Sequence, residues 1–124
     1  MIDLHSHTNE SDGTCSPAQL IEEAVRAGVT TLGITDHDTF SGYDQARPVA
    51  AEAGVDLVCG IELSTKLYGR SVHLLGYFPG DSGLADFRTW VLDLQAARRE
   101  RNARLATRLR QADGRPTWTP IRSI

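Results

Sequence analysis

The alternation of apolar and polar residues predicts strands and helices in turn along most of the chain. Three segments, residues 2–7, 29–35 and 55–64, are predicted to be extended, and the last two are rich in apolar and β-branched residues. Two segments between them, residues 16–28 and 41–54, carry apolar positions at helical spacing. Strands that alternate with helices are typical of βα units around a mostly parallel sheet or barrel. We therefore expect an α/β fold.

The first helix has recognisable signals at both ends. Ser16 suits the N-cap, Pro17 suits the first helical position, and Gln19 completes the pattern of a capping box. Gly28 suits the position just after the last turn. The apolar stripe that we expect to be buried consists of Leu20, Ile21, Ala24 and Val25.

The second expected helix, from about Ser41 to Ala53, contains Pro48 and is followed by Gly54. A proline in the interior of a regular helix costs about 3 kcal/mol. We therefore expect either a kink at Pro48 or a regular helix that starts only near Arg47.

A fourth strand, residues 71–78, follows the third after a link that is too short for a parallel crossover. The two strands must therefore form a hairpin. A turn centred on Tyr68 and Gly69 places Ser64 opposite His73. This register brings His73 toward the rim where the carboxyl ends of the strands lie, which is where βα architectures build their sites.

The C-terminal part is predicted to be helical. Arg98, Arg99 and Arg101 interrupt its apolar stripe, so one long helix or two helices joined near Arg98 both fit. Residues from Gly114 onward contain two prolines and no periodicity, and we expect them to be irregular. The stripe consists of Leu84, Phe87, Val91, Leu94, Leu105 and Leu109.

The composition changes this picture little. A hydrophobic content of 40% and a charged content of 23% are ordinary for a globular protein. No apolar run approaches the roughly 20 residues of a membrane span, and the N-terminus lacks the features of a signal peptide. Cys15 and Cys59 do not make a disulfide framework. We expect a cytoplasmic protein that does not bind membranes.

The net charge of −3 hides an asymmetry. Residues 1–83 carry 4 basic and 12 acidic side chains, whereas residues 84–112 carry 7 arginines and 3 acidic side chains. An acidic N-terminal part suits a site for several cations. The basic part is either a solvated helix surface, which we favour, or a surface that faces phosphates.

Six side chains are candidate metal ligands. The His-x-His of His5 and His7 directs both imidazoles to one side of an extended segment. Glu62 stands in an apolar strand, where an unpaired carboxylate is costly. All six donors are nitrogen or oxygen, which fits Mn, Zn or Fe, and they exceed what one tetrahedral ion needs. The six are His5, His7, Asp12, His37, Glu62 and His73.

The expected centre holds two or three ions that share a carboxylate. Clustered divalent ions activate water and clamp phosphate oxygens, so the pattern favours phosphoryl chemistry. Asp36 and Asp38 flank His37. We expect Asp36 to accept a hydrogen bond from an imidazole, and the alternative role is to cap a turn or helix.

Four motifs resemble the PHP (polymerase and histidinol phosphatase) family in order and spacing. The resemblance covers about residues 2–112 and is strongest to small bacterial phosphoesterases that hydrolyse nucleoside 3',5'-bisphosphates and short oligonucleotides from the 5' end. The motifs are Asp3–Gly13, Thr35–Thr39, Gly60–Ser64 and Val72–Tyr77.

The resemblance implies a distorted βα barrel with a trinuclear metal centre, often manganese, and a metal-bound hydroxide rather than a side chain as nucleophile. The implied ligands are His5, His7 and Glu62 for one ion, Glu62 and His73 for a second, and Asp12 and His37 for a third. In such relatives later strands add another histidine and an Asp-x-His pair. No histidine follows His73 here, so we expect a C-terminally truncated chain with a partial barrel.

The expected domains are residues 1–80, the N-terminal part of the metal-binding domain, residues 81–112, an incomplete helical insertion, and residues 113–124, an irregular tail. The expected function is that of a metal-dependent phosphoesterase, impaired in this chain, whose partner is a nucleotide or oligonucleotide phosphate and no specific protein. One alternative is a non-catalytic metal-binding remnant. A less favoured alternative is an amidohydrolase-type metal hydrolase, which also opens with His-x-His.

Overall fold

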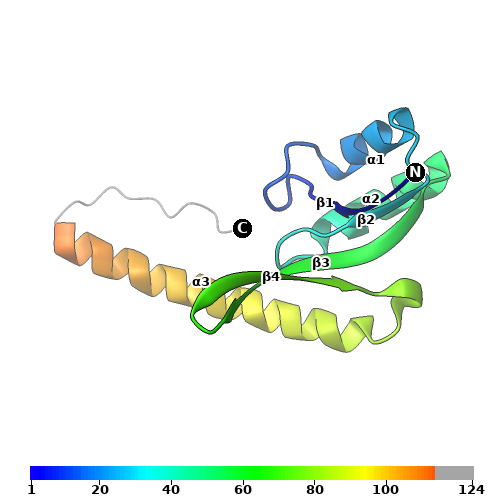
Figure 1. Ribbon diagram of the computed structural model, residues 1–124. Helices are drawn as coiled ribbons and strands as arrows, with labels where there is room; N and C mark the ends of the chain where they lie inside the picture. Colours follow the sequence, from blue (N-terminus) through cyan, green and yellow to red (C-terminus); the bar gives the residue numbers. More distant parts are fainter. Residues whose placement is uncertain (114–124) are drawn as a thin grey trace. The chain divides into compact units, whose positions relative to one another are not determined.

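The computed structural model describes residues 1–113, which form two units, residues 1–85 and a second unit that starts at Asp86 (Figure 1). Each unit is described by itself. Within residues 1–113, no helix combines the length and apolar character that crossing a membrane requires. Cys15 and Cys59 are both free thiols, as expected.

The first unit is a four-stranded sheet with helices on its crossover connections (Figure 1). The strands lie in chain order, the first three parallel and the fourth antiparallel to the third. The α/β expectation is therefore confirmed. The elements are β1 (Ile2–Ser6), α1 (Pro17–Arg26), β2 (Thr31–Ile34), α2 (Ser41–Ala53), β3 (Asp56–Leu67) and β4 (Arg70–Tyr77).

Helix α1 begins with the predicted capping box. The Ser16 hydroxyl accepts a hydrogen bond from the Gln19 amide at 3.3 Å, and the Gln19 side-chain oxygen accepts one from the Ser16 amide at 2.9 Å. Ile21 and Ala24 are buried as predicted, Leu20 is only half-buried, and Val25 is 50% exposed. The prediction for Val25 was wrong because this short helix buries a narrow stripe, and Val25 lies about 100° around the axis from Ala24.

Helix α2 runs from Ser41 to Ala53 without interruption at Pro48 and ends at Gly54, whose φ of 70° is left-handed. The alternative start near Arg47 is therefore wrong. Pro48 removes the amide that would donate to the Asp44 carbonyl, and both residues are exposed. Water can hydrogen-bond that carbonyl on the solvent side, which explains why the helix tolerates the proline.

The hairpin of β3 and β4 has the predicted register, with Ser64 opposite His73. Its two-residue turn, Tyr68 and Gly69, has φ values of 49° and 77°. Two positive φ values match the right-handed twist of the paired strands. Strand β3 extends to Leu67, beyond the expected end at residue 64, because the hairpin continues the strand past the end of its parallel pairing with β2.

The sheet is curled into a half-barrel. Although β1 and β4 are the two outer strands, the Tyr77 hydroxyl donates a hydrogen bond to the Leu4 carbonyl at 2.7 Å. Glycines on the inner strands allow close contacts that a side chain would block. A Cβ at Gly33 would lie 2.8 Å from the Leu4 oxygen, and a Cβ at Gly60 would lie 2.7 Å from Thr35 Cγ2. The small residues let β1 and β4 approach across the concave face.

The described part of the second unit lies in helix α3, Leu84–Asp113. The chain enters this helix after a short 3-10 helix, η1 (Pro79–Asp81). One continuous helix forms, so the alternative of two helices joined near Arg98 is wrong. Asp113 belongs to this helix rather than to the tail, and the rest of the expected irregular tail lies outside the described residues.

Candidate metal centre

The carboxyl ends of β1 and β2 bring the first candidate ligands to Glu62. His5 lies on β1, and His7 follows it on the same side of the extended chain. His37 pairs with Glu62 as an isolated parallel bridge. The backbone beside it continues the β2 pairing, since the Glu62 amide donates to the Asp36 carbonyl at 3.1 Å and the Asp38 amide donates to the Glu62 carbonyl at 3.0 Å.

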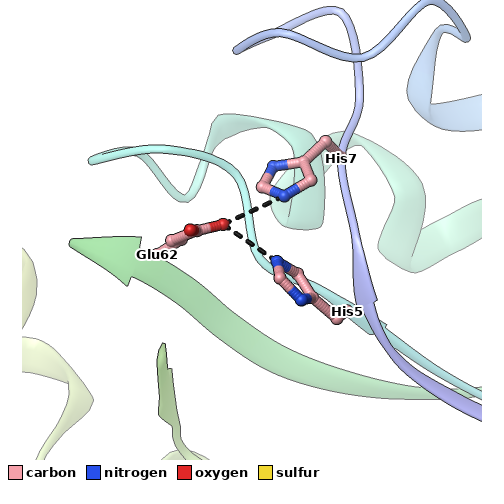
Figure 2. Close-up of side chains that lie close together, drawn as sticks. All are labelled: His5, His7 and Glu62. Carbon is pink, nitrogen blue, oxygen red and sulfur yellow. Dashed lines mark hydrogen bonds and ion pairs between the residues drawn. The ribbon is translucent and has the colours of Figure 1, made fainter. Parts of the chain in front are cut away.

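Glu62 is the middle of the cluster and is only 4% exposed. Its Oε2 lies 2.9 Å from His5 Nε2 and 3.0 Å from His7 Nε2 (Figure 2). Its Oε1 lies 2.6 Å from Nδ1 of His73, which the hairpin brings back to the site. His37 Nε2 lies farther away, 3.9 Å from Oε2, so one buried carboxylate faces imidazoles from three different segments. Glu62 lies inside β3 rather than at its end, but at the edge where parallel pairing stops.

Burial and neighbouring charges act on Glu62 in opposite directions. Burial by itself raises the pKa of the Glu62 carboxyl, while the hydrogen bond with His5 and the charges of His37, His5 and His7 lower it. The pKa of Glu62 lies below its ordinary value of 4.5 on balance. The histidines therefore keep this carboxyl ionised, which is the form that binds a cation.

Asp12 reaches the cluster from the loop after β1. Its Oδ1 lies 3.4 Å from His7 Nδ1, and its Oδ2 lies 3.3 Å from His37 Nε2. Its side chain is 54% exposed, in contrast to Glu62. The structure therefore brings all six predicted residues together, four from strands or strand ends and two from the loops that follow β1 and β2.

Three overlapping groups of donor atoms result, with the atoms of each group within 4.8 Å of one another. His7, His37 and Glu62 each belong to two groups, so the cluster is more closely shared than the resemblance implied. The groups are His5, His7 and Glu62, then His7, Asp12 and His37, and finally His37, Glu62 and His73.

The donor set fits divalent metal ions. Among the described residues, His7 Nδ1 and His37 Nδ1 are buried without a hydrogen-bond partner; the 3.4 Å approach of His7 Nδ1 to Asp12 is an ion-pair distance without hydrogen-bond geometry. The His7 and His37 rings stack with their centroids 4.9 Å apart. Stacked imidazoles repel each other if both rings are protonated, whereas neutral imidazoles beside carboxylates are ligands that divalent cations favour.

Asp36 differs from its expected role. It is 1% exposed, and its carboxylate accepts hydrogen bonds from Thr8 and Ser11 rather than from an imidazole. The geometry of the loop explains this, because Thr8 and Ser11 return to the carboxylate at shorter range than any ring. Sequence reasoning missed both residues, since a buried threonine and serine in a polar turn look like ordinary turn residues.

Two further residues near the site make contacts that the sequence did not predict. Asp38 has a φ of 55°, which is rare for a residue other than glycine, and its Oδ1 accepts a hydrogen bond from the Ser64 amide at 3.2 Å. This bond ties the loop after β2 to β3 beside Glu62. Tyr77 closes the sheet, and burial, then the charges of Glu62 and Asp3, raise the pKa of its phenol above 10.0.

Comparison with known proteins identifies similar sequences along most of the chain. Residues 3–107 match the model of the PHP domain family. A 5'-3' exoribonuclease of Haemophilus influenzae is 45% identical over 74 residues, which is 60% of this chain and 27% of the relative. A 3',5'-nucleoside bisphosphate phosphatase of Chromobacterium violaceum is 31% identical over 125 residues, which is 94% of this chain and 43% of the relative.

A solved structure shows the same fold. A Bifidobacterium adolescentis protein, described as a metal-dependent phosphoesterase, superposes with a TM-score of 0.69 at 35% identity, over 88% of this chain and 38% of that chain. This chain therefore spans less than half the length of these relatives.

Proposed function

Because this chain belongs to the PHP domain family, we propose that its cluster binds divalent metal ions and hydrolyses phosphate esters of nucleotides or short oligonucleotides. The observation that carries the proposal is the set of three overlapping donor groups around Glu62. The names of two relatives, an exoribonuclease and a nucleoside bisphosphate phosphatase, agree in one respect. Both describe the hydrolysis of phosphate esters.

The side chains prepare the site for an anionic substrate. Glu62 presents its two oxygens to different histidines, so it can hold two cations at a fixed separation. Ions bound there would supply Lewis-acid activation of water and of phosphate oxygens. Two divalent cations against the carboxylates of Glu62 and Asp12 leave a net positive site, since neutral imidazoles add no charge, and a positive site attracts phosphate.

We propose manganese as the resident metal, with zinc and iron as the competing ions. The three donor groups of the described chain contain imidazole and carboxylate only, with neither cysteine among them. This mixture lacks the thiolates that select zinc most strongly in structural sites. Calorimetric titration of the metal-free chain with each of the three ions would rank their affinities.

We propose further that this chain alone turns over more slowly than its full-length relatives. It spans 27% and 43% of the two relatives compared, and its own sequence contains no histidine after His73. Binding of metal ions with little turnover is the second candidate function, and the same observations favour it.

The test is phosphate release from a nucleoside 3',5'-bisphosphate by the purified, manganese-loaded chain, beside a full-length relative. Slow release that disappears in a His5→Ala, His7→Ala double variant is the expected result. Stoichiometric manganese binding without release would establish the binding function instead. Less than one bound ion per chain would contradict both.

We also propose a cytoplasmic location, which the two free cysteines favour.

A further inference from the structure

We propose that Asp36 is a positioning residue that fixes the loop of residues 8–13 and so holds Asp12 within reach of His7 and His37. The inference rests on the metal centre proposed above. In this role Asp36 supports a candidate ligand and is not itself a ligand.

Asp36 directs both carboxylate oxygens into this loop. Its Oδ1 accepts hydrogen bonds from the Thr8 amide and from the Ser11 hydroxyl, each at 2.7 Å. Its Oδ2 accepts one from the Thr8 hydroxyl, also at 2.7 Å. A carboxylate that is 1% exposed needs strong donors in place of water. Here three donors come from two residues of a single loop, so the charge and the loop conformation depend on each other.

The loop closes tightly on itself around Asp12. The amides of Ser11 and Gly13 both donate to the Thr8 carbonyl, at 3.1 Å and 2.9 Å. A Cβ at Gly13 would lie 2.2 Å from the His7 carbonyl oxygen, so the return leaves no space for a side chain. Asp12 therefore stands between Ser11, which Asp36 holds, and Gly13, which the backbone of Thr8 holds.

Helix α2 packs against the other side of the carboxylate. A Cβ at Gly42, in the first turn of α2, would lie 2.0 Å from Asp36 Oδ2 and 2.5 Å from Thr8 Oγ1. The first turn of a helix also favours a negative charge. Gly42 thus makes room for the Asp36 and Thr8 pair, and the carboxylate cannot retreat from the loop toward the helix.

The anchor matters because Asp12 has little support apart from the Ser11 hydroxyl, which Asp36 holds and which lies 3.5 Å from Asp12 Oδ1. Its side chain is 54% exposed, and its contacts with His7 and His37 are long, at 3.4 Å and 3.3 Å. Glu62, in contrast, is set by the backbone of β3. Loss of the anchor should therefore weaken the Asp12 corner of the centre and leave the corner around Glu62 in place.

The test is calorimetric titration of the full chain with Mn²⁺. Asp36→Ala should lower the affinity by about 10- to 100-fold, as loss of a supporting contact to a ligand does. Asp36→Asn should retain most of it, because the amide oxygen still accepts from Thr8 and Ser11 and its NH₂ can donate to the Thr8 hydroxyl. Asp56→Ala, which removes an exposed aspartate at the start of β3, is the matched control and should leave the affinity unchanged.

A double-variant cycle separates action through Asp12 from a general loss of structure. In an Asp12→Ala background, Asp36→Ala should change the affinity by under about threefold. A loss as large as in the wild-type background would overturn the proposal, and so would an Asp36→Asn variant as weak as Asp36→Ala. Should Asp36→Ala not fold, Thr8→Val removes the hydroxyl that donates to Asp36 Oδ2 while Ser11 and Asp12 stay unchanged, and it should still weaken binding measurably.

A second readout needs no metal. Amide hydrogen exchange of Ser11 and Gly13 in the metal-free chain should become faster in Asp36→Ala, because the loop loses its anchor. Unchanged exchange would overturn the positioning role. If the wild-type chain binds no Mn²⁺, the proposed function fails, while exchange still decides the role of Asp36.

Discussion

Glu62 combines charge, burial and shared contacts in one side chain. Glu62→Gln keeps the size of the side chain but removes the charge that two donor groups share. We expect Mn²⁺ affinity to fall by more than about 100-fold, since loss of a direct ligand should exceed the loss caused by a supporting residue. Calorimetry with Mn²⁺ measures this, and Glu52→Gln on the exposed side of α2 is the matched control. Equal affinity of wild type and Glu62→Gln would remove Glu62 from the centre.

Tyr77 gives the structure a dependence on alkaline pH. Its pKa is raised in the folded chain by burial and by the charges of Glu62 and Asp3. The neutral phenol is therefore stabilising below its ordinary pKa of 10.0, and this contribution is lost as pH rises through the raised value. Ultraviolet titration should show one tyrosine that ionises late.

The assignment of that late component follows from two variants. Tyr77→Phe should remove it and should also lower the free energy of unfolding by about 1 kcal/mol at neutral pH, the usual net value of one hydrogen bond. Tyr68→Phe alters a ring that is 96% exposed and should leave the late component in place. A late component that survives Tyr77→Phe would contradict the assignment.

At the level of single residues, the candidate ligands could be predicted from the sequence, whereas the residues that hold them in place could not. His5 and His7 share a face because of strand geometry alone, and Glu62 is conspicuous as a charge in an apolar strand. Thr8 and Ser11 give no such signal. Their contacts with Asp36 depend on how the loop folds back across more than 20 residues of intervening chain, which no local pattern encodes.

Among the secondary-structure elements, the hairpin offers the clearest test. Its turn places Tyr68 at a φ of 49°, a conformation that an L-residue other than asparagine, aspartate or glycine adopts at a cost. Asn-Gly is the preferred pair for such a turn. Tyr68→Asn should therefore stabilise the chain by roughly 0.5–1 kcal/mol, visible as a higher midpoint in thermal unfolding.

The side chain of Tyr68 makes this test direct. It is 96% exposed, so its removal leaves no cavity. Tyr68→Val, with a β-branched side chain at the same left-handed position, should instead destabilise the hairpin. Equal midpoints for the Asn and Val variants would show that the turn is not strained.

The types and order of the helices and strands could be predicted from the sequence more reliably than their first and last residues. The capping box of α1 and the two-residue turn of the hairpin are local, and both occur where predicted. The lengths of β3 and α2 depend on tertiary contacts. Strand β3 continues because β4 pairs with it, and α2 accepts Pro48 because that side of the helix faces solvent.

For the whole molecule, the half-barrel sets what the centre can hold. The sheet curls so that residues from β1, the loop after β2, β3 and β4 meet at one edge. The meeting of the six candidate ligands at this edge could be predicted from their positions along the sequence. The sharing of ligands between the donor groups could not, because it depends on side-chain distances that only the folded sheet defines.

The number of bound ions follows from this sharing. A neutral imidazole has one lone pair, so His7 and His37 can each ligate only one ion although each belongs to two groups. One ion with His5, His7 and Glu62, and another with His37, Glu62 and His73, use every histidine. No histidine is left for a third ion, and Asp12, which lies beside His7 and His37, would be a further ligand to these two ions. We therefore expect the chain to saturate at about two Mn²⁺ ions, measured by metal analysis after equilibrium dialysis.

Variants distinguish which ions remain. His73→Ala should leave about one tightly bound ion, at His5, His7 and Glu62, because the second ion would keep only His37 and Glu62 as ligands. His5→Ala should leave about one ion at the other group. Glu62→Gln should leave none, since both groups share its carboxylate. Saturation near three ions in the wild type would mean that Asp12 and His37 hold an ion of their own, and that the geometry of the cluster changes when metal binds.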